Sequence, residues 1–501
     1  MYSFFTKPTI VKISWFIICF SLIIGGFLRF GSLLNYTAFQ GDQSFHGGFI
    51  MDIWSGKMPT LGSTTSAGGH SLTPLHYYLF WIFTIFGTNP VFQALPNAVF
   101  SFLSIPALVY FIYRLLNKTE QTKRLFLSAL AGFWWTFFYN DILFASFEWN
   151  PNPIAYFALS FILLIDLIVN QYIKNPKIIA VSWIFLGINT ALFTSLHTTT
   201  LLLYPIIFVV FLAYYTFKTK TIKLTLISVF SFFITLTPYW IGEWQTSGHN
   251  TKALIDTLLN SQSTLTILEK INRIFFNYFE IGPLMYFDNT LSYLSFGFLG
   301  LVLTLALFHF VGNKQMWTWY LVTTLLYFLI AMNYTGIYFV HYKEVFWVLP
   351  IIFTIVTLNY LISIENKITK ILGITTISLL IFLSIFLNTR HTYRMFQQKY
   401  GSTRQIGVND YIDIFSSVIK NQTICTPYIQ NIWDRNALNF IDKYNTKKAI
   451  IITKDCTPGS IEILPKYDFP DLSKRQIPTK ILPESRAKVV KDSDAYYLIE
   501  R

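Results

Sequence analysis

Long apolar runs alternate with short polar segments over residues 1–387. Each run has the length that a helix needs to cross a bilayer, so the pattern predicts about eleven transmembrane helices. The first run, Ile13 to Phe30, follows Lys7 and Lys12 and precedes no small-residue cleavage site. It is predicted to be a retained helix, with a removed signal peptide as the alternative. The further predicted spans are Pro90 to Leu116, Leu125 to Phe144, Ile154 to Val169, Ile178 to Leu196, Thr198 to Phe217, Leu224 to Trp240, Leu291 to Val311, Trp317 to Met332, Val345 to Ile362 and Ile371 to Leu387.

Basic residues fall in alternate loops between these runs, for example Lys118 to Arg124, Lys218 to Lys223 and Lys367 to Lys370. The positive-inside rule then predicts that these loops and the N-terminus are cytoplasmic. The intervening segments are predicted to be extracytoplasmic, and they hold nearly all of the polar complexity of the chain. These segments are residues 31–89, 139–153, 241–290, 333–343 and the tail 388–501.

The composition supports a protein of the cell membrane. Hydrophobic residues make up 53% of the chain and charged residues only 13%, which is too little polar material for a water-soluble surface of this size. A net charge of +13 would suit nucleic acid, but the Lys and Arg residues are spread over short loops rather than gathered in one stripe. Membrane lipid is therefore the predicted partner, and nucleic acid is not.

The tail, residues 388–501, changes character and is predicted to be a small extracytoplasmic α/β domain that follows the transmembrane module of residues 1–387. Short apolar runs at Ala449 to Ile452 and Ala495 to Ile499 suit strands, and Ile432 to Tyr444 has helical spacing. Because its apolar content is low, we expect this domain to depend on the membrane module for part of its stability.

The cysteines leave one question open. Cys425 and Cys456 both lie in the tail and are the candidate pair for a disulfide in an oxidising compartment, and two separate buried thiols are the alternative. No Cys/His spacing indicates structural zinc, and no Gly-rich loop indicates direct use of a nucleotide. No cofactor is predicted. A divalent metal is left open, although no Asp/Glu cluster resembles a complete hard-cation site.

The segment between the first two spans carries the strongest functional signal. Apolar residues recur at helical spacing between Gln43 and Trp54. This pattern predicts an amphipathic helix in the membrane interface, with Asp42 at its N-terminal end. Pro74 to Phe86 is apolar but too short to span comfortably, so it is predicted to be interfacial or re-entrant. The Gly/Ser/Thr-rich loop Gly62 to Ser71 joins the two.

Short motifs spread over most of the membrane region resemble those of the GT-C superfamily of polyprenyl-phosphate-sugar glycosyltransferases, in particular bacterial family 39-like members related to protein mannosyltransferases and aminoarabinose transferases. The chain departs from related loops at Phe45 and His46, where Arg and Asp are common, so no second acidic catalytic residue is predicted there. The matching residues are Gly41, Asp42 and Gln43; Leu61, Gly62, Gly68 and Gly69; Pro74, Leu75, Tyr77 and Tyr78; Trp149, Asn150, Pro151, Asn152 and Pro153; and His341 and Tyr342 with Pro350.

The resemblance implies that a sugar passes, with inversion, from a polyprenyl-phosphate-linked donor to an extracytoplasmic acceptor, which is a glycan, a lipid or a protein. Such chemistry needs a carboxylate to accept the acceptor's proton and cations to hold the departing phosphate. Asp42 is the candidate base, and an N-cap of the interfacial helix is the structural alternative. Candidates for binding donor or acceptor on the next outer loop are Glu148, Asn150 and Asn152, which would otherwise serve a Pro-rich turn.

Four cations are candidates for the phosphate: Arg273, His341, Lys343 and, more weakly, Lys57. Each is also explained as an interface anchor with a snorkelling side chain. A transporter or flippase of a lipid-linked sugar is the alternative function from another class. Transporters usually show repeated halves and midplane charges, whereas this chain shows no convincing internal repeat and few charges within its spans. A polymerase or ligase of surface polysaccharide shares the donor chemistry and remains a second enzyme alternative.

Overall fold

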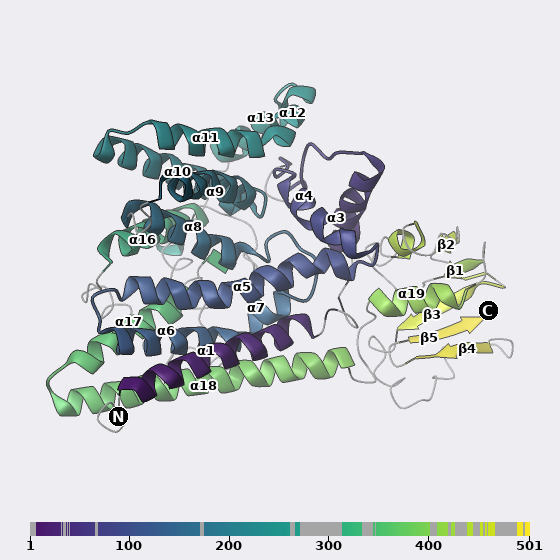
Figure 1. The fold of residues 1–501 in the computed structure, drawn as a ribbon. Helices are drawn as coiled ribbons and strands as arrows, with labels where there is room; N and C mark the ends of the chain where they lie inside the picture. Colours follow the sequence, from purple (N-terminus) through teal and green to yellow (C-terminus); the bar gives the residue numbers. More distant parts are fainter. Residues whose placement is uncertain are drawn as a thin grey trace.

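The computed structural model is a bundle of helices joined at one end to a small domain with a sheet (Figure 1). It describes residues 7–31, 33, 37, 39, 41–65, 69–170, 175–260, 266–270, 313–332, 344–345, 347–400, 408–418, 422–425, 438–443, 451–453, 456–457, 459–465, 488–493 and 496–500. The helices outside the small domain are α1 (Lys7–Phe30), α3 (Gly41–Asp52), α4 (Leu75–Trp81), α5 (Val91–Leu115), α6 (Gln121–Thr136), α7 (Tyr139–Phe144), α8 (Ile154–Asn170), α9 (Pro176–Thr194), α10 (Thr198–Thr219), α11 (Lys223–Thr235), α12 (Thr237–Gln245), α13 (His249–Asn260), α16 (Lys314–Met332), α17 (Leu349–Ser363) and α18 (Lys367–Tyr400).

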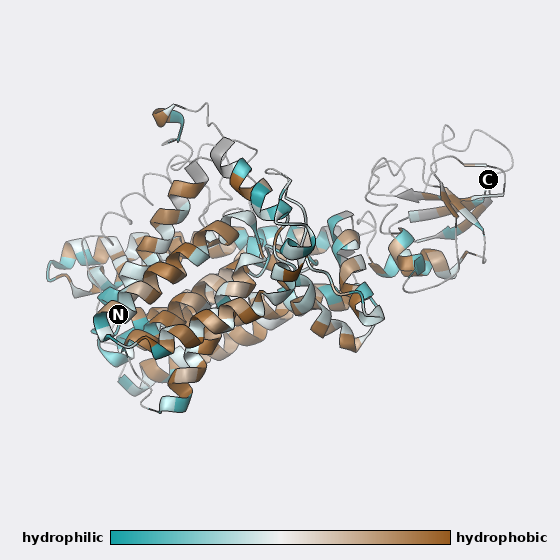
Figure 2. Ribbon diagram, turned by 90° about the horizontal axis from the view of Figure 1, so that it is seen from above, coloured by the Kyte–Doolittle hydropathy of each residue, from teal (hydrophilic) through white to brown (hydrophobic). Residues whose placement is uncertain are grey.

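These helices lie where the hydropathy pattern predicts them, and Figure 2 shows hydrophobic residues along the whole bundle. Within the described residues, five helices are long and apolar enough to cross a membrane: α1, α5, α9, α10 and α18. The bent pair of α11 and α12 makes a sixth candidate. The predicted span Leu291 to Val311 lies outside the described residues, so the total of eleven stays a prediction. The chain is thus a polytopic helical membrane protein.

The predicted span Leu125 to Phe144 is divided into α6 and α7, although no Pro or Gly marks the break. The cause lies on another helix. The guanidinium group of Arg29 in α1 donates to the carbonyl oxygens of Trp135 and Thr136 at 3.3 and 3.2 Å. These carbonyls lie in the last turn of α6, and the Trp135 carbonyl also accepts from the backbone N–H of Phe138 at 3.0 Å. Arg29 therefore caps α6, and the chain turns before α7 begins.

A second predicted span, Leu224 to Trp240, bends by 54° between α11 and α12. Pro238 occupies the first turn of α12, where its missing N–H removes no helical hydrogen bond but its ring prevents α11 from continuing. The break is therefore explained by the sequence.

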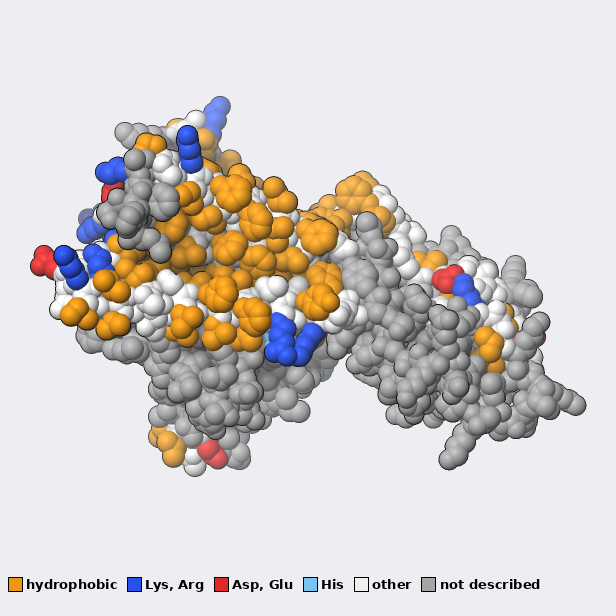
Figure 3. All heavy atoms as spheres, turned by 90° about the horizontal axis from the view of Figure 1, so that it is seen from below, with side chains coloured by type: hydrophobic (Ala, Val, Ile, Leu, Met, Phe, Trp, Pro, Cys, Tyr) orange, Lys and Arg blue, Asp and Glu red, His pale blue; other side chains and the backbone are white. Residues whose placement is uncertain are grey.

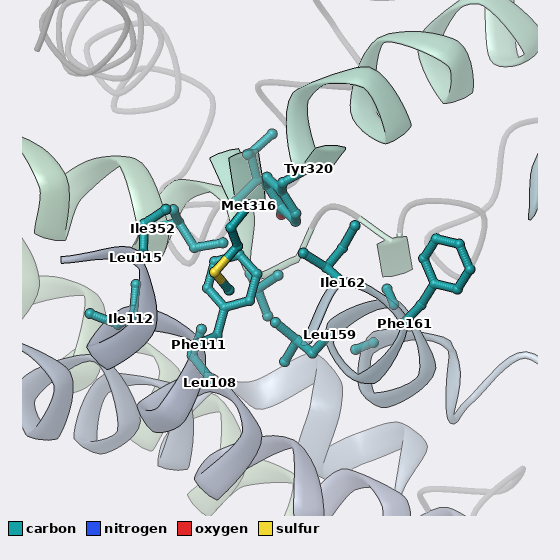
Figure 4. Close-up of a cluster of buried hydrophobic side chains, with 14 of the residues drawn as sticks. Leu108, Phe111, Ile112, Leu115, Leu159, Phe161, Ile162, Met316, Tyr320 and Ile352 are labelled. Carbon is teal, nitrogen blue, oxygen red and sulfur yellow. The ribbon is translucent and has the colours of Figure 1, made fainter. Parts of the chain in front are cut away.

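The centre of the bundle is a closely packed apolar core built by α5, α8, α16 and α17, part of which is shown in Figure 4. Phe111 of α5 lies edge-on to Tyr320 of α16, with ring centroids 5.4 Å apart. The rings of Phe161 in α8 and Tyr204 in α10 also pack edge to face, with centroids 5.2 Å apart. Aromatic pairs of this kind hold the helices together beyond simple burial. They account for much of the high aromatic content of the sequence.

The small domain is an α/β unit, as predicted. Its mixed sheet has the order β2-β1-β3-β5-β4, in which β1 runs parallel to β2 and β3, and β5 runs antiparallel to β3 and β4. Cys425 and Cys456 form a disulfide with their Cα atoms 5.1 Å apart. The question that the sequence leaves open is thus answered in favour of the bond. The elements are α19 (Val408–Ser416), β1 (Thr423–Cys425), β2 (Ile451–Thr453), β3 (Ile461–Pro465), β4 (Lys488–Asp492) and β5 (Tyr496–Glu500).

The small domain shares its core with the membrane module. Phe440 packs on Phe39 with ring centroids 5.0 Å apart, and Lys443 forms an ion pair with Asp52 at the end of α3, at 3.5 Å. The backbone N–H of Val408 donates to the carbonyl of Thr37 at 3.2 Å. Buried residues of both parts form one continuous apolar cluster. Its members include Met51, Val91, Ala94, Ala98, Tyr411, Ile414, Phe415, Leu438, Ile461 and Leu498.

This packing leaves little space around α3 at Gly47. A Cβ atom at Gly47 would lie 2.4 Å from Oε1 of Gln93 and 3.1 Å from the ring of Phe440. Gln93 is fully buried, so its side chain has little room to move away. At the neighbouring Gly48 an added Cβ would meet nothing within 4 Å.

The two glycines therefore make a matched pair for a stability test. We predict that Gly47→Ala lowers the free energy of unfolding by about 1–3 kcal/mol, because it overpacks the contact between α3, α5 and the small domain. Gly48→Ala should leave stability unchanged or raise it by up to about 1 kcal/mol, because Ala favours helix more than Gly. Thermal unfolding in detergent compares them, and equal midpoints for the two variants would contradict the tight packing at Gly47.

Candidate active site

The interfacial helix predicted at Gln43 to Trp54 is α3, followed by a 3-10 turn, Ile53–Ser55. Asp42 lies in the first turn of α3, after the helix has begun at Gly41. Its carboxylate is exposed and lies where the helix dipole favours a negative charge. His46 follows four residues later and is therefore on the same face, but it is only 4% exposed. One face of α3 thus presents an accessible carboxylate beside a buried imidazole.

Glu148 reaches this face from the segment between α7 and α8. Its carboxylate is 1% exposed, and Oε1 lies 3.3 Å from Nδ1 of His46. The segment is held by amide side chains. Asn152 donates to the carbonyl oxygens of Phe144 and Phe147 at 2.6 and 3.1 Å. Residues 102 positions apart in the sequence therefore meet as a buried pair.

The loop between α3 and α4 supplies the third part of the site. It folds back on itself through backbone bonds from Gly62 to Leu72 and from Leu72 to Ser63, at 2.8 and 3.0 Å. This turn brings the Ser63 hydroxyl to 2.8 Å from Nε2 of His46 and 3.3 Å from the Tyr77 hydroxyl of α4. Both ring nitrogens of His46 are therefore occupied. Helix α3, the loop and the segment before α8 are joined through one imidazole.

The electrostatics of the site favour a bound proton on the pair of His46 and Glu148. Burial lowers the pKa of His46, but the Glu148 carboxylate, its hydrogen bond and the nearby Asp42 together raise the pKa above its ordinary value. Burial raises the pKa of the Glu148 carboxyl, and the charge of Asp42 adds to this against the opposing effect of His46. Both shifts make the folded pair hold a proton more tightly than the separate side chains would.

A second histidine, His76 of α4, completes the buried wall of the site. Its ring centroid lies 5.3 Å from that of His46 and 3.9 Å from that of Tyr77. Burial lowers its pKa well below the ordinary value, and the charge on His46 adds to this lowering. The pKa values of the two histidines are therefore shifted in opposite directions, and His46 holds a proton more readily than His76.

The structure places Asn150, Asn152 and Lys57, the other candidates among the described residues, outside this cluster. Asn150 is buried and donates to the carbonyl of Leu196 at 2.6 Å, so both Asn150 and Asn152 support the segment that carries Glu148. Lys57 is exposed beyond the far end of α3, 3.7 Å from Asp52. Arg273, His341 and Lys343 lie outside the described residues. Among the residues that the structure does describe, no three His, Cys, Asp or Glu side chains gather as metal ligands would.

Sequence reasoning missed His46, Ser63 and Tyr77. His46 stood out only as a departure from related loops, and its spacing of four residues from Asp42 was the available signal. Tyr77 appeared only as a member of the motif from Pro74 to Tyr78, and Ser63 carried no signal, because the contacts of both residues depend on how the loop folds back. The order of carboxylate, imidazole and hydroxyl in Glu148, His46 and Ser63 is also that of a serine-hydrolase triad. The carboxylate of such a triad also raises the pKa of its histidine, so the raised pKa of His46 is common to both arrangements.

The fold is similar to that of solved protein structures. No family model and no curated protein sequence matches the chain. Among solved structures, ArnT from Cupriavidus metallidurans bound to undecaprenyl phosphate is similar, with a TM-score of 0.50 and 10% identity over 97% of each chain. The oligosaccharyltransferase of Archaeoglobus fulgidus in the apo form has a TM-score of 0.48 and 13% identity, covering 87% of this chain and 64% of that chain. The likeness to ArnT confirms the GT-C-like fold that the motifs imply.

The paired proton gives the site a measurable pH dependence. The folded pKa of His46 lies above its unfolded value of about 6.5, so the stability that the pair contributes is fully present below that pH and is lost as pH rises through the folded pKa. The raised pKa of Glu148 acts in the same direction. We therefore predict that the unfolding midpoint of the wild type falls as pH rises above about 6.5.

In Glu148→Gln this decline should disappear, because burial then lowers the pKa of His46 without an opposing carboxylate beside it. The matched control is Glu120→Gln, which removes an exposed carboxylate paired with Lys7 and should keep the decline. Thermal unfolding in detergent as a function of pH makes the comparison. The same slope in wild type and Glu148→Gln would show that the pair does not hold the proton.

Proposed function

We propose that this protein is a membrane glycosyltransferase that moves a sugar from a polyprenyl-phosphate-linked donor to an extracytoplasmic acceptor. The observation that carries the proposal is the cluster of Asp42, His46 and Glu148 at one end of a bundle with a GT-C-like fold. The likeness to a structure that binds undecaprenyl phosphate supports a lipid-linked donor. By the positive-inside rule, the end with α3 and the small domain faces away from the cytoplasm.

In the proposed reaction Asp42 is the general base. Its carboxylate accepts the proton of the acceptor's nucleophile, which attacks the anomeric carbon of the donor. The bond between that carbon and the phosphate oxygen breaks, and polyprenyl phosphate leaves with the electron pair. Attack opposite the leaving group inverts the configuration. An exposed carboxylate suits this role because the acceptor arrives from outside, and no described side chain forms an ion pair with Asp42.

The buried pair then has a positioning role. Because His46 binds Glu148 on one side and Ser63 on the other, it fixes the face of α3 that carries Asp42. Arg273, His341 and Lys343 are proposed to contribute further cations for the departing phosphate, on the strength of the sequence motifs alone.

Two other functions fit the same membrane architecture. A transporter or flippase would move the lipid-linked sugar without breaking its phosphate bond, and transporters usually place ionisable groups near the bilayer midplane. The charged cluster described here lies instead on an interfacial helix and on the segment between α7 and α8. A polymerase or ligase of surface polysaccharide would use the same chemistry on a different acceptor.

The proposal is tested by comparing the glycans, glycoproteins and lipids of the cell envelope with and without the gene. We expect one sugar-modified species to disappear on deletion, to return with the wild-type gene, and to remain absent with Asp42→Asn. The species that disappears identifies the acceptor class. An unchanged envelope, in cells shown to express the protein, would contradict the proposed transferase.

A further inference from the structure

The long helix α18 changes chemistry along its outward face. Its exposed apolar side chains include Leu379, Phe382 and Phe386, three or four residues apart. The same row continues at steps of four residues to Arg390 and Arg394, which are both exposed. Figure 3 shows a broad apolar face on the bundle with Lys and Arg side chains at both ends.

The opposite face of α18 is fixed against the bundle, so the orientation of this row is determined. The Trp134 indole donates to Oγ of Ser384 at 2.9 Å, and the Tyr139 backbone N–H donates to Oδ1 of Asn388 at 2.9 Å. Residues pointing away from these contacts face the surroundings of the bundle. Arg390 and Arg394 therefore lie on the surface that lipid covers.

The length of α18 places the two arginines at a membrane boundary. The rise from Lys370 to Arg390 is about 30 Å at about 1.5 Å per residue. This matches the hydrocarbon thickness of a bilayer, about 30 Å. With Lys367 and Lys370 at one boundary, Arg390 and Arg394 reach the phosphate level of the other leaflet. The exposed ring of Tyr393 lies between them, as is typical of an interfacial aromatic residue.

The described part of the chain supplies no carboxylate partner for the two arginines. They stand four residues apart, a spacing at which like charges on a helix repel each other. Among the described residues, no carboxylate forms an ion pair with either guanidinium. An anion from outside the protein would relieve this repulsion, and a planar guanidinium suits phosphate oxygens in particular.

We propose that Arg390, Tyr393 and Arg394 form a binding surface for the headgroup of an anionic phospholipid, distinct from the cluster around Asp42. The acyl chains lie along the exposed row of Leu379, Phe382 and Phe386, and the phosphate lies between the two guanidinium groups. The surface would anchor the end of α18 that leads into the small domain. This proposal is independent of the glycosyltransferase reaction.

A photoactivatable phosphatidylglycerol tests the proposal with the intact protein in nanodiscs, against the matching phosphatidylcholine at equal amounts. Mass spectrometry locates the adducts on residues 379–397. We expect about a thirtyfold excess of phosphatidylglycerol adducts there, because two surface cations that each contribute on the order of 1 kcal/mol together favour the anionic lipid by about 2 kcal/mol. If the two arginines were only snorkelling interface anchors, the two lipids would label these residues equally.

The variant R390Q/R394Q should reduce labelling by phosphatidylglycerol to the level of phosphatidylcholine. The control K367Q/K370Q changes the same charge at the other end of the same helix and should keep the excess. Lys367, Arg390 and Arg394 are exposed and Lys370 is half-buried, and each variant is required to elute as a monodisperse protein before labelling. Equal labelling by the two lipids in the wild type, or an excess that survives in R390Q/R394Q, would overturn the proposal.

Discussion

Asp42→Asn should be folded and inserted in the membrane, should bind donor, and should lose about two to four decades of transfer rate, the usual contribution of a general base. The substitution keeps the size of the side chain and its ability to accept a hydrogen bond, but it removes proton acceptance. Because Asp42 is exposed and forms no ion pair with the described residues, its replacement should change stability little. Turnover is measured with saturating donor and acceptor in proteoliposomes.

Asp52→Asn is the matched control for this variant. It makes the same substitution at the other end of α3, where the carboxylate pairs with Lys57 and Lys443 at 3.7 and 3.5 Å. Surface ion pairs of this kind contribute little, so near-normal turnover is expected. If Asp42→Asn also turned over near the wild-type rate, Asp42 would be a residue that stabilises the start of α3 rather than a base.

Arg29→Met should destabilise the membrane module by about 3–5 kcal/mol, the effect of leaving one member of a buried ion pair alone. Arg29 is fully buried, and its Nε and Nη2 both donate to Oδ2 of Asp141, at 3.1 and 2.5 Å. Nε also donates to the Ser101 hydroxyl at 2.6 Å. The variant would leave Asp141 charged in the core and would uncap α6. Thermal unfolding in detergent measures the loss.

Two controls separate the ion pair from the rest of the contact. The double variant R29M/D141N should lose less stability than the sum of its two single variants, because it leaves no unpaired charge. Lys7→Gln breaks an exposed ion pair with Glu120 at the other end of α1, and we expect no measurable change in stability. Strict additivity of R29M and D141N would show that the pair is not coupled.

The positions of most helices could be predicted from the sequence, because a run of apolar residues long enough to cross a bilayer has few other uses. The break between α6 and α7 could not be predicted in this way. Arg29 lies 112 residues from Asp141, and its capping of α6 depends on a contact between helices that hydropathy does not encode. The bend at Pro238 could have been predicted, because proline cannot continue the preceding helix.

The candidate site shows the same division. Asp42 was found from a short motif and Glu148 from its place on the next outer loop, and the structure brings the two into one cluster. In the sequence, His46 was only a departure from the family pattern. Its role could not be predicted, because its Nδ1 contacts a carboxylate 102 residues away in the sequence. The disulfide between Cys425 and Cys456 could not be decided for a similar reason. Strands β1 and β2 bring the two cysteines together only after the sheet has formed.

The most direct test of the central proposal is the release of polyprenyl phosphate by purified protein in proteoliposomes that contain a polyprenyl-phosphate-linked sugar and an acceptor fraction from the cell envelope. We predict that wild-type protein releases one polyprenyl phosphate for each sugar transferred, and that Asp42→Asn releases almost none. Movement of the intact sugar-lipid across the bilayer without release of polyprenyl phosphate would contradict the proposal and identify the protein as a transporter.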